Sequence, residues 1–150
     1  MTKGLYFEDF DENLAMETER RVITEDDINN FAVLSGDHNP MHTDAEYAAT
    51  TPFGQRVAHG LLGLSVASGQ SFQLGFLEGT VLAFTGLEWK FRKPIFIGDT
   101  IRTQVKVVKL REMKRAGGGF VTFEVQVLNQ DDEVTQKGEW VVLVASKPDA

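Results

Sequence analysis

The sequence predicts a single α+β domain in which one long helix packs against an antiparallel sheet. In the first half of the chain, apolar residues recur at helical spacing. After Gly79 they alternate with a period of two, and turn-rich segments join the strand-like stretches. The chain has 150 residues, of which 42% are hydrophobic and 25% are charged, an ordinary globular balance. We therefore treat residues 1–150 as one domain.

The helices are expected in the first half of the chain. Thr24 is a typical N-cap followed by three acidic residues, and Gly36 suits the end of that helix. A short helix is predicted from Asp44 to Ala49, and a turn follows it over residues 50–54. The longest helix is predicted from Gly60 to about Phe76, where small residues would allow close contact with a sheet or a ligand.

The strands are expected mainly in the second half. Residues 81–91 alternate along one strand face until Pro94 ends the strand. Further strands are predicted at 101–110, 120–128 and 134–145, and an earlier strand near residues 16–23 should join the same sheet.

Composition excludes several classes of function. The net charge of −7 without a basic tract argues against a nucleic-acid partner. The chain has no cysteine, so it forms no disulfide and has no thiol nucleophile, which suits a reducing compartment. The most apolar stretch, residues 61–77, is interrupted by serine and glutamine and is too polar to cross a bilayer. With no signal-peptide pattern at its start, the chain is expected to be cytoplasmic, without a membrane partner.

All three histidines lie close together in the sequence, and a metal site is one interpretation. His38 and His42 are four residues apart and would share a face of a helix. Gly36 and Pro40 make a continuous helix there improbable on steric grounds, and no third ligand has a familiar spacing. A nucleophilic triad of Ser35 or Ser65 with His42 and Asp37 lacks the G-x-S-x-G elbow. No metal is therefore expected.

General acid–base chemistry is the third interpretation. Asp37 and His42 on one irregular loop could converge on a water or a substrate carbon. The alternative, in which Asp37 caps the next segment and His42 is only a buried ring, stays open on these residues alone. His59-Gly60 opens the long helix, where free N–H groups could stabilise negative charge on a carbonyl oxygen.

At these residues the sequence resembles the MaoC-like, (R)-specific enoyl-CoA hydratases. The resemblance rests on F-A-V-L-S-G-D-H-N-P-M-H over residues 31–42, in which G-D-x-N-P-x-H is a specific motif. It continues through Asp44, residues 47–48, 53–54 and 57–60, F-R-K-P at 91–94 and G-D at 98–99, and so covers most of the chain.

The resemblance implies a hot-dog fold, in which a sheet wraps a long central helix. It also implies a homodimer or higher homo-oligomer with active sites at the subunit interface. It places the catalytic pair on Asp37 and His42, with Asn39 supporting the motif. Gly60 would hold the thioester oxygen, and His59 beside it is grouped with the substrate-binding residues. The family's active-site serine aligns best with Ser68, although Ser65 lies one turn away.

The implied reaction is hydration of a trans-2-enoyl-CoA to an (R)-3-hydroxyacyl-CoA, or the reverse dehydration. The pair would take a proton from one water as it attacks C3 and return a proton to C2. No cofactor is required, because coenzyme A arrives with the substrate. The expected acyl pocket lies between the long helix and residues 84–89. Two alternatives remain, a hot-dog acyl-CoA thioesterase and a non-catalytic acyl-CoA-binding protein.

Overall fold

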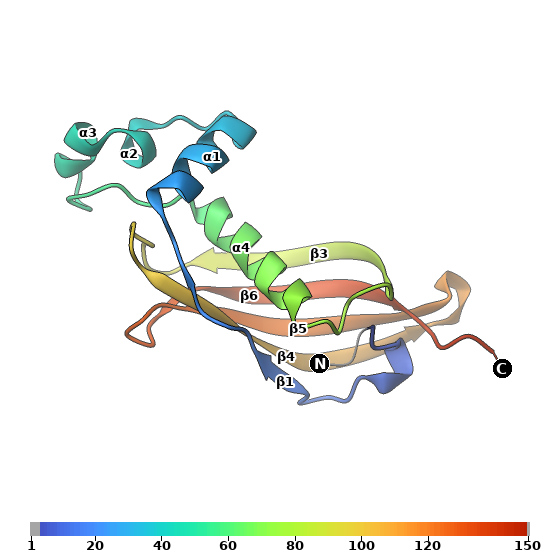
Figure 1. Ribbon diagram of the computed structural model, residues 1–150. Helices are drawn as coiled ribbons and strands as arrows, with labels where there is room; N and C mark the ends of the chain where they lie inside the picture. Colours follow the sequence, from blue (N-terminus) through green and yellow to red (C-terminus); the bar gives the residue numbers. More distant parts are fainter. Residues whose placement is uncertain (1–3, 150) are drawn as a thin grey trace.

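Residues 4–149 are described by a computed structural model, in which one helix lies across an antiparallel sheet (Figure 1). The strands are β1 (Ala15–Glu17), β2 (Arg21–Val22), β3 (Val81–Phe91), β4 (Thr100–Met113), β5 (Gly118–Leu128) and β6 (Val134–Ala145). The α-helices are α1 (Glu25–Ser35), α2 (Pro40–Thr43), α3 (Ala45–Ala49) and α4 (Gly60–Gln73), and short 3-10 helices cover Phe7–Asp9 and Lys114–Ala116. The predicted α+β class is confirmed.

The sheet has the strand order β1-β4-β5-β6-β3, and every pairing is antiparallel. β1 and β2 pair with successive parts of β4, so they share one edge of the sheet. β3 pairs with β6 and forms the opposite edge. The backbone groups on the outer side of β3 therefore have no neighbouring strand within residues 4–149.

The core lies between α4 and the face of the sheet that it crosses. Leu62 and Ala67 of α4 are buried there with aliphatic and aromatic residues of the strands. The polar Gln70 is buried too, because its amide donates to the Ile101 carbonyl (3.1 Å) and accepts from the Thr103 hydroxyl (2.8 Å). These bonds fix α4 in register with β4. No helix within residues 4–149 is both long and apolar enough to span a membrane.

The three short helices lie beyond one end of the sheet, near the first residue of α4 (Figure 1). Thr24 caps α1 as predicted, since its hydroxyl accepts from the Asp27 N–H while the Asp27 carboxylate accepts from the Thr24 N–H. Gly36 ends α1 with φ of 82°, in the left-handed region that glycine favours. Asp44 caps α3, so the predicted helix there is also confirmed.

Two predicted boundaries and one predicted pattern were wrong. The strand near residues 16–23 is divided into β1 and β2, and α4 ends at Gln73, after which the chain turns. The predicted alternation along residues 81–91 also fails, because the register of β3 against β6 shifts twice, between Val81 and Ala83 and between Phe84 and Gly86. Each shift moves the following side chains to the other face.

Candidate active site

Asp37 lies on the loop between α1 and α2, and local bonds fix its backbone. Its N–H donates to the Ser35 hydroxyl (3.1 Å), which itself donates to the Phe31 carbonyl (2.7 Å). One carboxylate oxygen of Asp37 accepts from the Asn39 N–H at 3.1 Å. The Asp37 side chain is exposed in the single chain, and its second carboxylate oxygen has no hydrogen-bond partner in residues 4–149.

A single helical turn, α2, carries His42. Asn39 is its N-cap, with its side-chain oxygen accepting from the Met41 N–H (3.2 Å), and Pro40 occupies the first helical position, where no donor is needed. This accounts for the spacing G-D-x-N-P-x-H. His42 Nδ1 lies 2.7 Å from the Val57 carbonyl, an acceptor only, so Nδ1 has the hydrogen and Nε2 is left free.

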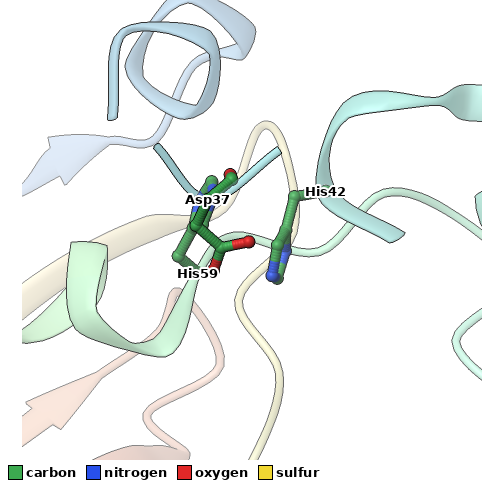
Figure 2. Close-up of side chains that lie close together, drawn as sticks. All are labelled: Asp37, His42 and His59. Atoms are coloured by element: carbon green, nitrogen blue, oxygen red, sulfur yellow. The ribbon is translucent and has the colours of Figure 1, made fainter. Parts of the chain in front are cut away.

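The side chain of His59 lies close to those of Asp37 and His42 (Figure 2). Its ring stacks on the ring of His42, with centroids 4.0 Å apart and planes inclined by 25°. Its Nε2 lies 2.9 Å from the Asp37 carbonyl oxygen. One ligand-type atom each of Asp37, His42 and His59 lies within 4.8 Å of the others, and Figure 2 shows the Asp37 carboxylate pointing toward the ring of His42.

The pKa of His59 is lowered below its usual value. Burial of the ring is the main cause, and the neighbouring His42 adds to it, whereas the bond to the Asp37 carbonyl opposes it. His59 Nδ1 is buried without a hydrogen-bond partner. A proton on that nitrogen would be a buried donor without an acceptor, so His59 is neutral with its hydrogen on Nε2.

A cavity of 610 Å³ opens beside His42 at the start of α4. Its walls are largely apolar, with two cations and a glutamine among them, and it is lined by Met41, His42, Phe53, Val57, Ala58, Gly60, Leu61, Phe91, Arg92, Lys93, Pro94, Ile95 and Gln136. Gly60 is the first residue of α4, where an N–H has no acceptor within the helix. A Cβ at Gly60 would stand 2.7 Å from the Phe91 ring, so a larger residue here would require that ring to move.

Comparison with known proteins gives the family. The MaoC-like domain model matches residues 10–129. This chain belongs to the MaoC-like family. It is 36% identical to the 3-hydroxybutyryl-CoA dehydratase of Methylorubrum extorquens over 97% of this chain and 88% of that protein. It is 37% identical to the (R)-specific enoyl-CoA hydratase of Aeromonas caviae over 75% of this chain and 79% of that one.

Solved structures support the same assignment and the fold. A monoamine oxidase regulatory protein from Archaeoglobus fulgidus superposes with a TM-score of 0.91 and 36% identity, covering 99% of the MaoC-like chain and 98% of its own. A double-hotdog protein of Mycobacterium tuberculosis superposes with a TM-score of 0.85 at 20% identity, with 98% of this chain and 46% of that one covered. The predicted hot-dog fold is confirmed.

The structure of the MaoC-like chain places the predicted site residues in two groups. Asp37, Asn39, His42, His59 and Gly60 meet at one end of α4. The side chain of His59 bonds to the protein backbone and does not line the cavity.

Ser68 lies apart from this group, on the exposed face of α4, with its hydroxyl donating to the Ser65 carbonyl (2.7 Å). Ser65 donates in the same way to the Leu61 carbonyl (2.8 Å), and neither serine lines the cavity. Beyond α4, this cavity is lined by Phe91 and residues 92–95 and not by residues 84–89, where the acyl pocket was expected.

The three clustered side chains do not form a favourable metal site. A metal bound by histidine lies in the plane of the ring, about 2.0–2.1 Å from the nitrogen. Because the rings of His42 and His59 stack nearly parallel, an ion in the plane of one ring lies well outside the plane of the other. Two of their four nitrogens also bond to carbonyl oxygens. The absence of a metal from the site remains a prediction.

Two residues that contact the predicted site have no sequence signal that could have marked them. Arg56 is buried, and its Nε donates to the carbonyl of His42 at 2.6 Å. Gln136 of β6 donates to the Gly60 carbonyl (3.1 Å) and accepts from Trp89 Nε1 (2.9 Å), which anchors the start of α4 to the sheet. Each of these three hydrogen bonds joins residues that are distant in the sequence.

Proposed function

We propose that this protein interconverts a trans-2-enoyl-CoA and an (R)-3-hydroxyacyl-CoA by adding or removing water. The observation that carries the proposal is the placement of the Asp37 carboxylate and the free Nε2 of His42 beside an apolar cavity that starts at Gly60. Homologues named as hydratases and dehydratases support a hydro-lyase activity. Asp37 and His42 as the acting pair are our inference.

In this mechanism one water binds between the free carboxylate oxygen of Asp37 and Nε2 of His42. The pair removes a proton as the water oxygen bonds to C3, and the electron pair of the double bond moves toward the thioester carbonyl. The N–H of Gly60 stabilises the negative charge on that oxygen. A proton then returns from the pair to C2, on the face from which the water came. The enzyme ends with the protons it began with.

The cavity lining suits a thioester with an apolar acyl part and an anionic carrier. Lys93 forms an ion pair with Glu133, whereas the exposed guanidinium of Arg92 has no ionic partner within residues 4–149. We place the phosphates of coenzyme A toward Arg92 and the acyl chain against the apolar walls. Coenzyme A is part of the substrate, and the mechanism uses no other cofactor.

The proposed enzyme works as a homodimer that pairs along β3. Apolar side chains are exposed on the edge strand β3 and on the outer face of α4, among them Leu61, Phe72, Leu87 and Phe91. Leu61 and Phe91 line the cavity. A partner on this face would cover an incomplete site and bring its own groups near Ser68.

The test is an assay of the purified protein with crotonyl-CoA, following loss of the conjugated double bond and the chirality of the product. We expect (R)-3-hydroxybutyryl-CoA. Asp37→Asn should lower kcat by about 10²–10⁴-fold, because the amide keeps the acceptor for the Asn39 N–H but cannot take a proton. His42→Asn should do the same, since an amide can still donate toward the Val57 carbonyl while Nε2 is lost.

Asp44→Asn is the matched control. It makes the same chemical change at the cap of α3, where asparagine also caps, and should keep full activity. Release of free coenzyme A would support a thioesterase instead. Acyl-CoA binding without turnover of linear, branched or dicarboxylic enoyl thioesters would support a binding protein.

A further inference from the structure

The five residues from Arg56 to Gly60 contact both members of the proposed pair. Arg56 Nε donates to the His42 carbonyl (2.6 Å), and the Val57 carbonyl accepts from His42 Nδ1 (2.7 Å). Two residues later, His59 Nε2 donates to the Asp37 carbonyl (2.9 Å). Thus one segment holds the backbone of Asp37 and both the backbone and the ring of His42.

The segment itself is fixed on two sides. The Ala58 N–H donates to the Ile95 carbonyl (2.7 Å), and Val57 forms an isolated antiparallel bridge with Phe96. On the other side, the end of the Arg56 guanidinium donates to the carboxylate of Glu25 (2.8 Å) and the side-chain oxygen of Asn29 (2.7 Å) in α1. Arg56 through His59 are all buried. A segment with this many contacts is a firmer support than the exposed loop that carries Asp37.

The ring of His59 is suited to fix the position of Asp37 while remaining uncharged. It is 3% exposed and lies between Phe31, with centroids 4.9 Å apart, and His42. Within residues 4–149, its one hydrogen bond is to the Asp37 carbonyl, and its other nitrogen has no partner. The ring does not reach the cavity, so its influence on a substrate must pass through Asp37 and His42.

We propose that His59 and Arg56 are positioning residues, which set the separation of Asp37 and His42 by holding the backbone of each member to one rigid segment. This inference rests on the proposed hydratase function. It goes beyond that function by assigning to His59 the placement of Asp37, and to Arg56 the placement of His42. A shift of about 1 Å in a reacting group is enough to cost about 10²-fold in rate.

Two substitutions of His59 separate positioning from packing. In glutamine the amide nitrogen is as many bonds from Cβ as Nε2 is in histidine, so His59→Gln can still donate to the Asp37 carbonyl. His59→Leu fills similar space without a donor. We expect kcat to fall by about 10²-fold in His59→Leu with KM changed less than about threefold, and to stay within about tenfold of wild type in His59→Gln. His38→Gln, on the exposed neighbour, is the control and should leave kcat unchanged.

For Arg56 the contact to His42 can be separated from the contact to α1. Arg56→Lys keeps a positive charge near Glu25 but loses the Nε donor to the His42 carbonyl, and should lower kcat by at least about tenfold. Glu25→Gln leaves that donor in place and should keep kcat within about twofold. Equal losses of kcat in the two variants would show that Arg56 only stabilises the fold.

A spectroscopic readout tests the positioning independently of turnover. The chain has three histidines, so ¹⁵N spectra of their rings can be assigned by single substitutions. The Nδ1–H signal of His42 should be kept in His59→Gln and should shift or broaden in His59→Leu. An unchanged signal in His59→Leu, or equal kcat in the two variants, would overturn the role of His59. If the wild type hydrates no enoyl thioester, the proposed function fails while the spectra still decide the positioning.

Discussion

Asp37 and His42 are held by different kinds of contact, and this difference suits them to different tasks in the proposed mechanism. His42 is buried and lines the cavity, and because its carbonyl oxygen and Nδ1 are both bonded, Nε2 is the ring nitrogen available to a ligand. Asp37 is exposed and uses one carboxylate oxygen to close its own turn. In the proposed mechanism, the second carboxylate oxygen of Asp37 binds the water, and the buried ring of His42 keeps a fixed position beside it.

At the same scale, His59 should make the folded protein sensitive to acid. Its pKa is lowered chiefly by burial, so the unfolded chain takes up a proton near the usual histidine pKa of about 6.5 while the folded chain does not. The contribution is absent above that pH and destabilises the fold increasingly as the pH falls below it. We expect the urea-measured free energy of unfolding to fall less in His59→Gln than in wild type between about pH 7.5 and pH 5.5. The same decrease in both proteins would contradict this.

Which residues could be predicted follows from how far apart the contacting groups lie in the sequence. Asp37, Asn39 and His42 fall within one short motif, and the bonds made by the side chains of Asp37 and Asn39 are local, so the pattern alone indicates the pair. The bond from His59 to Asp37 spans 22 residues, and those of Arg56 to Glu25 and Asn29 span 31 and 27. No local pattern predicts such contacts, because they depend on how α1 and α4 are brought together.

At the scale of elements, the end of α1 sets the direction of the loop that carries Asp37. Gly36 adopts φ of 82°, and no atom lies within 4 Å of the place where a Cβ would stand. Gly36→Ala should therefore cost about 1–2 kcal/mol through backbone strain alone, which lowers Tm by about 2–4 °C per kcal/mol. Gly36→Asn should lose less, because asparagine tolerates this conformation. Thermal unfolding of the three proteins checks the order; equal Tm values would contradict it.

The elements themselves were predicted well where caps and turns mark them. Thr24, Gly36 and Asp44 all sit at the helix ends that their chemistry indicates. β3 was predicted at its correct bounds, yet its alternating face was not found. Alternation arises when a strand buries one face, and β3 lies at a sheet edge with most residues on both faces exposed. The contacts within one chain therefore do not explain the apolar alternation in the sequence of β3.

At the scale of the whole molecule, several of the apolar residues that the fold leaves exposed lie on β3 and α4. Leu61 is 60% exposed on α4 and Phe91 is 55% exposed on β3, and both border the cavity. β3 also offers unpaired backbone groups along its outer side. An isolated chain would leave this edge open to uncontrolled pairing. Two copies joined along β3 would satisfy the backbone and bury the apolar surface together.

This arrangement predicts a dimer whose dissociation reduces activity. Sedimentation at micromolar concentration should give twice the chain mass of 16.7 kDa. Leu87→Lys places a charge on β3 at a residue 48% exposed in the single chain, and should shift the protein toward monomer. Leu34→Lys, on α1, is the matched control, since Leu34 is 83% exposed and lies away from β3. Because Leu87 does not line the cavity, any loss of hydration in Leu87→Lys should be recovered as protein concentration rises. A wild-type monomer with full activity would show that one chain holds a complete site.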